Sequence, residues 1–156
     1  GARNVVGTDL SPYRRELAMK MGATMVIDPT RETLREKMAT LHMVGGFDVG
    51  LECSGSPVAF NDMVNNMYNG GKISLLGLLP SSTQINWSKL IFKGLTLKGI
   101  YGREMYETWY QMEMMLLTGL DISGVITHRF PAANFREAFD IMEAGNCGKI
   151  ILDWEQ

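Results

Sequence analysis

The chain has 156 residues, of which 46% are hydrophobic and 21% are charged, a size and composition typical of one globular domain with an apolar core. Its formal net charge is -2, from 15 basic and 17 acidic residues, which gives no electrostatic reason to expect a nucleic acid or an anionic membrane as partner. No apolar run approaches the length of a transmembrane helix, and Gly1 to Asn4 lack the layout of a signal peptide, so we expect a cytoplasmic protein.

Short apolar runs alternate with amphipathic segments through the first two thirds of the chain. Ser11 can cap a helix, Pro12 suits its first turn, and Gly22 follows its end. The apolar runs are bounded by turn residues and therefore predict strands, and their near-continuous apolar character fits burial on both faces. In chain order we predict strand 4–9, helix 12–21, strand 24–27, helix 30–41, strand 47–52, helix 58–67, strand 72–76 and strand 95–100.

This alternation predicts an α/β fold with a partial Rossmann-like, doubly wound parallel sheet. Asn69-Gly70-Gly71 is predicted to end the helix that precedes the strand at 72–76. The last part of the chain is less regular, and no internal repeat or low-complexity linker separates it from the rest. There we predict helix 104–117, strand 126–130, helix 134–143 and strand 148–154.

Asp9 ends the first predicted strand, immediately before a helix. In dinucleotide-binding folds a carboxylate at this place bonds the adenosine ribose hydroxyls, and it repels a 2'-phosphate, which favours NAD over NADP. Arg14, five residues on, could pack against the adenine or pair with Asp9. An aspartate at a strand end also commonly caps the next helix, so Asp9 alone leaves both interpretations open.

The glycine-rich turn that normally accompanies such an aspartate does not occur in this sequence. A dinucleotide fold places G-x-G-x-x-G about 20 residues before the acidic residue. Only eight residues precede Asp9, and no G-x-G occurs anywhere in the chain. We therefore expect the sheet to lack its first strand and the phosphate-binding turn, and we expect a much lower affinity for a dinucleotide. The unpaired strand edges would then favour a rearrangement of the chain, an exchange of segments with a second copy, or pairing with the missing part of the domain.

Two later strand ends could also reach a cofactor. Gly77, in Leu75-Leu76-Gly77-Leu78, ends the strand at 72–76, and Ile100-Tyr101 ends the strand at 95–100. Carboxyl ends of parallel strands share the edge at which doubly wound sheets bind ligands, and glycine leaves the backbone accessible. Plain strand-to-loop turns would give the same pattern. The two cysteines and two histidines lack the spacing of a metal site, so we predict free thiols and no metal ligands.

Taken together, these segments resemble the L-threonine 3-dehydrogenases among the zinc-dependent medium-chain dehydrogenases, and the chain resembles their C-terminal, cofactor-binding half. The segment Gly99-Ile100-Tyr101-Gly102-Arg103-Glu104-Met105 and the following Thr108-Trp109-Tyr110 are the most specific to the threonine enzymes. The remaining segments of the resemblance are Asp9-x4-Arg14, Phe47 to Glu52, Ser54-Gly55, Leu76 to Leu78, Ile91 to Leu95, Lys98, Ile126 to Phe130 and Gly148 to Leu152.

The resemblance implies an NAD site and a reaction. Asp9 and Arg14 would hold the adenosine end of NAD, Leu76, Gly77 and Leu78 would line its middle and nicotinamide ribose, and Ile100 and Tyr101 would lie by the nicotinamide. The family oxidises L-threonine to 2-amino-3-oxobutanoate with NAD as hydride acceptor and zinc as Lewis acid. Its zinc ligands and catalytic residues lie in an N-terminal domain that this sequence does not match, so no catalytic or metal-binding residue is predicted here, and His128 is interpreted as structural.

The resemblance also implies an incomplete NAD-binding domain at residues 1–124 and a C-terminal segment, 125–156, that would pack on the catalytic domain. It implies a homotetramer in which residues 95–100 pair with their copy. The isolated chain is expected to be inactive. Two alternatives stay open: a fragment of another medium-chain alcohol or polyol dehydrogenase, and a truncated, non-catalytic binding or assembly module.

Overall fold

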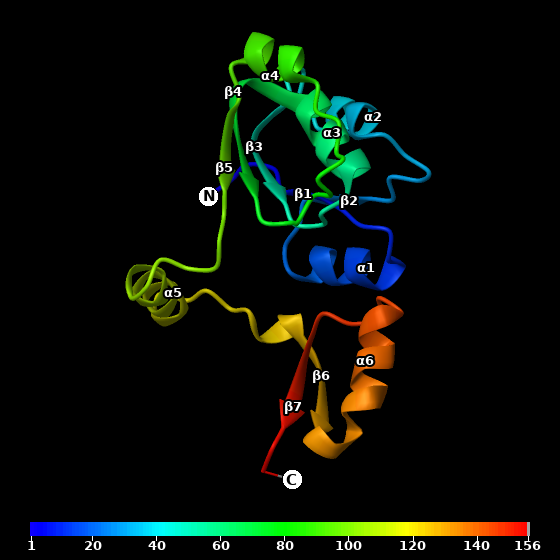
Figure 1. The fold of residues 1–156 in the computed structure, drawn as a ribbon, viewed down its shortest axis with the longest axis vertical. Helices are drawn as coiled ribbons and strands as arrows, with labels where there is room; N and C mark the ends of the chain where they lie inside the picture. Colours follow the sequence, from blue (N-terminus) through cyan, green and yellow to red (C-terminus); the bar gives the residue numbers. More distant parts are fainter. Residues whose placement is uncertain (156) are drawn as a thin grey trace. The chain divides into compact units, whose positions relative to one another are not determined.

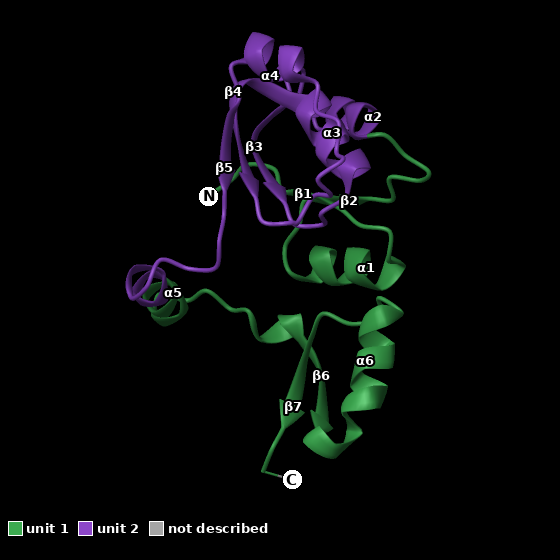
Figure 2. Ribbon diagram, viewed as in Figure 1, with its two compact units in different colours: residues 1–33, 112–156 green, residues 34–111 purple. Residues whose placement is uncertain are grey.

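A computed structural model describes residues 1–155, and its contacts divide the chain into two compact units. Figure 1 shows the elements in chain order, and Figure 2 shows the two units in separate colours. Unit 1 combines residues 1–33 with the C-terminal part from Met112, and unit 2 contains residues 34–111. Helix α5 (Glu107–Leu117) crosses the division between the two. Of the helices in this described range, none is both long and apolar enough to cross a bilayer.

Unit 1 contains two small parallel sheets, β1–β2 and β6–β7. Ser11 caps α1 by accepting a hydrogen bond from the Arg14 backbone N–H at 3.3 Å, and Pro12 is its first residue, as predicted. The elements are β1 (Val6–Thr8), α1 (Pro12–Lys20), β2 (Met25–Ile27), η1 (Ser123–Val125), β6 (Ile126–Pro131), η2 (Ala132–Asn134), α6 (Phe135–Glu143) and β7 (Lys149–Asp153).

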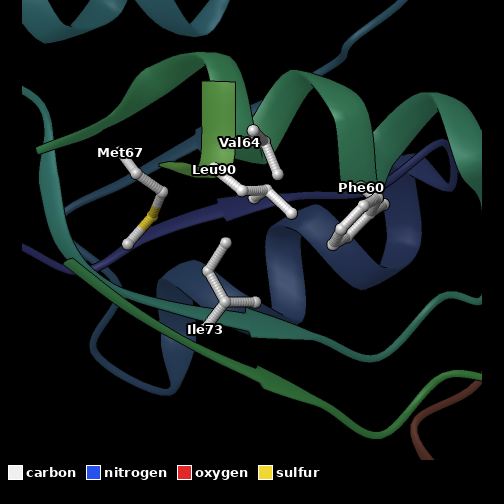
Figure 3. Packing of buried hydrophobic residues seen from close by; sticks show 5 residues of the cluster. All are labelled: Phe60, Val64, Met67, Ile73 and Leu90. Atoms are coloured by element: carbon white, nitrogen blue, oxygen red, sulfur yellow. The ribbon is translucent and has the colours of Figure 1, made fainter. Parts of the chain in front are cut away.

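Unit 2 is a three-stranded parallel sheet in the order β3–β4–β5 with connecting helices. Its core is a cluster of five buried side chains from β4 and from helices α3 and α4, drawn in Figure 3: Phe60, Val64, Met67, Ile73 and Leu90. Phe60 is completely buried, and burying such a side chain contributes about 2–3 kcal/mol. The elements are α2 (Leu34–Thr40), β3 (Phe47–Glu52), α3 (Pro57–Asn66), β4 (Met67–Leu75), α4 (Trp87–Lys93) and β5 (Thr96–Gly99).

The junction of α3 and β4 differs from the prediction. The sequence predicts that Asn69-Gly70-Gly71 ends a helix, whereas α3 ends at Asn66 and β4 begins at once. The register between β3 and β4 shifts at this point, because Phe47 pairs with Met67 but Val49 pairs with Lys72. Gly70 has a φ of 79° in this irregular stretch, which glycine adopts without steric cost. The glycine pair therefore accommodates a bulge inside a strand.

Three helices also differ from the sequence prediction. Helix α4 is not predicted at all, although Asn86 caps it by accepting from the Lys89 backbone N–H at 3.1 Å. Helix α2 begins at Leu34, not at residue 30, because the Asp28 carboxylate accepts from the backbone N–H and the hydroxyl of Thr30 and holds a turn there. Helix α5 begins at Glu107, not at residue 104. Strand β4 begins at Met67, five residues before the predicted start at 72, and the remaining ends of the predicted strands and helices agree within two residues.

Strands β1 and β3 have one partner each within residues 1–155: β1 pairs with β2, and β3 pairs with β4. Each strand therefore has an edge whose N–H and C=O groups have no strand partner, which favours pairing with another chain. We expect the isolated chain to self-associate in solution, which light scattering coupled to size-exclusion chromatography would detect as a mass at least twice the monomer's 17.4 kDa. A stable monomer with a well-dispersed amide spectrum would contradict this expectation.

Candidate functional site

The residues after β4 and β5 lie at one edge of the unit 2 sheet. The strands are parallel, Leu75 pairs with Gly99, and the Ile100 N–H donates to the Leu75 carbonyl at 2.8 Å. Figure 1 shows β3, β4 and β5 running side by side to this carboxyl edge. Leu78 is 94% exposed and Tyr101 is fully exposed, so large apolar side chains face solvent here. Apolar side chains gathered at the carboxyl edge of a parallel sheet are suited to contact a ligand.

Gly77 lies in a position that only glycine fits. A Cβ atom at this residue would lie 2.2 Å from the Gly55 nitrogen and 2.3 Å from Glu52 Oε2. The loop after β3 and the loop after β4 are therefore in direct contact. Gly55 itself has a φ of 68°, and a Cβ there would lie 2.8 Å from the Leu78 carbonyl oxygen. The backbone of these loops is thus placed closely enough to form one surface.

Glu52 is the buried centre of this arrangement, with 1% of its surface exposed. Its Oε1 atom accepts from the Ser54 N–H at 2.9 Å, the Ser54 hydroxyl at 2.5 Å and the Gly55 N–H at 3.0 Å. Its main-chain carbonyl accepts from the N–H groups of Leu76 and Gly77. The sequence analysis predicts no role for this residue. The sequence feature that could have indicated one is a charged residue at the end of an apolar strand, just before Ser54-Gly55.

Asp9 follows β1 and begins the turn into α1 in unit 1. Its Oδ1 atom accepts from the Ser11 N–H at 2.8 Å. The Arg14 side chain, in the first turn of α1, donates from Nε to the Cys147 carbonyl at 3.3 Å. The Ser11 hydroxyl donates to the Gly145 carbonyl at 2.7 Å. The turn that carries Asp9 and Arg14 is therefore fastened to the loop between α6 and β7.

Arg15 is a second residue that sequence reasoning missed. Its Nη1 atom donates to the main-chain carbonyls of Asp9 at 2.7 Å and Leu10 at 2.9 Å. Its Nη2 atom lies 3.2 Å from Asp28 Oδ2, and both side chains are largely covered. Arg15 thus ties the carboxyl ends of β1 and β2 together and fixes the backbone at Asp9. An arginine six residues after Asp9, near the start of the predicted helix, together with a second strand-ending aspartate, Asp28, is the sequence signal for this contact.

Hydrogen bonds from Thr30, followed by the charges of Arg15 and Arg31, hold the pKa of Asp28 below its usual 3.8. Folding therefore favours the ionised carboxylate, whose stabilising contribution is complete above that value and is lost as the pH falls through the lower folded-state pKa. The wild-type chain should therefore lose stability as the pH falls from about 5 to about 3, and we expect Asp28→Asn, which has no carboxylate to protonate at this position, to lose less over the same range. Urea unfolding of both proteins across this range would test this, and parallel pH profiles would contradict it.

Within residues 1–155, no group of three or more histidine, cysteine, aspartate or glutamate side chains could hold a metal ion. Cys53 is an exposed free thiol and Cys147 a buried one. The ring of His128 stacks on Phe130 and its Nδ1 lies 2.9 Å from the Thr127 hydroxyl. Thr127 in turn accepts from the Gly148 N–H, so this histidine belongs to the packing of β6 against β7.

The sequence matches a protein-family model over most of its length. The model describes zinc-binding dehydrogenases and covers residues 1–119. The chain belongs to this family. The predicted relationship to the zinc-type dehydrogenases is therefore confirmed.

Curated relatives in this family match almost all of the chain. The L-threonine 3-dehydrogenase of Burkholderia ambifaria is 59% identical over 154 residues, which is 99% of this chain and 45% of the relative. That of Alteromonas mediterranea is 56% identical over 155 residues, 99% of this chain and 46% of the relative. The chain spans about half the length of the curated relatives it matches.

Solved structures of dehydrogenases share the fold. The 2R,3R-butanediol dehydrogenase of Bacillus subtilis superposes with a TM-score of 0.83 at 22% identity, over 96% of this chain and 43% of that one. A short chain alcohol dehydrogenase of Escherichia coli, complexed with NADH, superposes with a TM-score of 0.84 at 20% identity, over 98% of this chain and 45% of that one. The α/β prediction is confirmed. The predicted boundary between residues 124 and 125 stays a prediction.

Proposed function

We propose that this chain is the NAD-binding part of an L-threonine 3-dehydrogenase, which oxidises L-threonine to 2-amino-3-oxobutanoate. The observation that carries the proposal is the 59% identity to the B. ambifaria enzyme across 99% of the chain. The segment around Tyr101 to Tyr110, which resembles the threonine enzymes, favours this substrate over other alcohols. When NAD is bound, it is the acceptor of the hydride from the substrate.

The residues that would bind NAD fall into two groups. In unit 1, the Asp9 carboxylate would accept hydrogen bonds from the adenosine ribose hydroxyls, and Arg14 would lie at the adenosine end. In unit 2, the backbone of Leu76, Gly77 and Leu78 would line the middle of the cofactor. The steric fit supports this second role, because Gly77 has no room for a side chain against Gly55 and Glu52, so close contact with the loop after β3 fixes the backbone between the exposed Leu76 and Leu78.

Ile100 and Tyr101 complete the proposed cofactor surface at the nicotinamide. Tyr101 is fully exposed and follows β5 at the same edge as Leu76. An apolar surface at this place would exclude water from the ring that accepts hydride. The described residues do not provide a set of metal ligands, so zinc binding is not assigned to them.

We further propose that the complete enzyme is a homotetramer in which β5 pairs with its copy. Strand β5 pairs with β4 alone among the described residues, so its outer edge is available to a second subunit. Analytical ultracentrifugation of the complete enzyme would test the oligomeric state.

The decisive test joins the chain to the part of the B. ambifaria enzyme that it does not cover and measures NADH formation. We expect turnover with L-threonine and little with 2,3-butanediol. The runner-up function, another medium-chain alcohol or polyol dehydrogenase, predicts the reverse preference. A folded, zinc-loaded fusion that turns over neither substrate would instead favour a non-catalytic binding module.

A further inference from the structure

Glu52 joins two loops through different parts of one residue. Its carboxylate accepts the N–H groups of Ser54 and Gly55 after β3. Its main-chain carbonyl accepts the N–H groups of Leu76 at 2.8 Å and Gly77 at 3.0 Å after β4. The conformation of one loop is therefore linked to that of the other through a single residue, whose side chain holds the first loop and whose main chain holds the second.

The chemistry of this position differs from what packing alone requires. A buried ionisable side chain is costly, and a well-packed apolar residue of similar volume is commonly as stable or more so. A carboxylate is an acceptor-only group, and here its Oε1 faces three donors at once. An apolar side chain would leave the Ser54 and Gly55 N–H groups without this acceptor. Glutamate at this position therefore fixes the geometry of the loop after β3.

The geometry extends from Glu52 to the exposed surface in two steps. The Gly55 nitrogen lies so close to Gly77 that no Cβ fits between them, and Gly55 approaches the Leu78 carbonyl in the same way. The Gly55 N–H is itself held by both carboxylate oxygens, at 3.0 and 3.2 Å. A shift of Gly55 away from Glu52 would therefore open the contact that places Gly77 and Leu78.

We propose that Glu52 is a positioning residue for the cofactor: its carboxylate locks Ser54 and Gly55 against Gly77 and thereby sets the surface that receives the nicotinamide half of NAD. This inference rests on the proposed function. It predicts two separable effects of Glu52→Gln, a loosened pair of loops and a selective loss of affinity for the nicotinamide half.

The first readout is amide hydrogen exchange in the 156-residue chain. In Glu52→Gln the acceptor loses its charge, which weakens the bonds to the remaining oxygen, and an amide N–H group replaces Oε2, the second acceptor of the Gly55 N–H. We therefore expect exchange at Ser54 and Gly55 to be about tenfold faster. Glu52→Gln should also shift the resonances of Leu76 to Leu78, and Ser54→Ala, which removes the hydroxyl donor, should shift them in the same direction with a smaller amplitude. Glu113→Gln, the same change at an exposed site on α5, should alter neither. Unchanged exchange at Ser54 and Gly55 in a folded Glu52→Gln chain would overturn the proposal.

The second readout compares NAD with AMP, which carries only the adenosine end. We expect Glu52→Gln to weaken NAD binding about fivefold and to leave the Kd of AMP within about twofold. Equal weakening of both ligands, or no change in NAD affinity despite faster exchange, would overturn the positioning role. Because the exchange readout needs no cofactor, a wild-type chain that fails to bind NAD would count against the proposed function, and the exchange result would still decide whether Glu52 holds the two loops together.

Discussion

Replacing Gly77 with alanine is expected to destabilise the chain by about 3 kcal/mol, the upper range for inserting a methyl group into a packed site. The new Cβ would lie 2.2 Å from the Gly55 nitrogen and 2.3 Å from Glu52 Oε2. The first of these atoms is backbone, and the second belongs to a side chain held by three donors. Neither can move without breaking the hydrogen bonds that join the loops after β3 and β4.

Urea unfolding followed by circular dichroism would measure this effect. Gly99→Ala is the matched control, because a Cβ at Gly99, at the end of the neighbouring strand β5, meets no atom within 4 Å. We expect the control to change the unfolding free energy by less than about 0.5 kcal/mol. Similar midpoints for wild type and Gly77→Ala would show that the two loops are not in the contact described.

Replacing Lys93 with methionine is expected to cost about 2 kcal/mol, because the ammonium group makes charge-assisted hydrogen bonds. Its Nζ atom donates to the main-chain carbonyls of Val64 at 3.1 Å, Asn65 at 2.7 Å and Met67 at 2.8 Å. These carbonyls end α3, where a positive charge also offsets the helix dipole. Methionine retains the apolar stem, so the change removes mainly the charge and its bonds.

Lys89→Met, one turn earlier on α4, provides the control. Lys89 is exposed and donates to the Asn65 side chain alone among the described residues. Burial, and then the charge of Lys89, lower the pKa of Lys93 from its usual 10.5, so the control also removes a repulsion. We expect Lys89→Met to leave the urea midpoint nearly unchanged. Equal losses in the two variants would contradict a specific role for Lys93 at the end of α3.

The alternating strands and helices can be predicted from the sequence because caps, turns and apolar runs depend only on neighbouring residues. Ser11 and Pro12 mark the start of α1 whatever surrounds it, and β3 is predicted at its observed bounds. The strand ends then indicate where Asp9, Gly77 and Tyr101 lie. The prediction that Asn69-Gly70-Gly71 ends a helix is wrong because glycines end helices and also accommodate bulges, and only the pairing of β4 with β3 decides between the two.

The contacts that hold the candidate site together lie beyond local signals. Helix α4 has only seven residues and depends on packing through Leu90, so its short amphipathic segment predicted no helix. The roles of Arg15 and Glu52 arise from groups on different strands and loops that meet after folding. For Glu52, the burial of an acidic side chain becomes evident only with coordinates.

Calorimetric titration of the 156-residue chain with NAD at millimolar concentration would show whether Asp9 and the rest of the proposed surface bind the cofactor. We expect weak binding that Asp9→Ala reduces by about tenfold, because the ribose hydroxyls lose a charge-assisted acceptor. We also expect NADP to bind more weakly than NAD to the wild-type chain, since the Asp9 carboxylate repels a 2'-phosphate. The absence of NAD binding, or equal affinity in Asp9→Ala, would contradict the claim that this chain carries the NAD-binding residues.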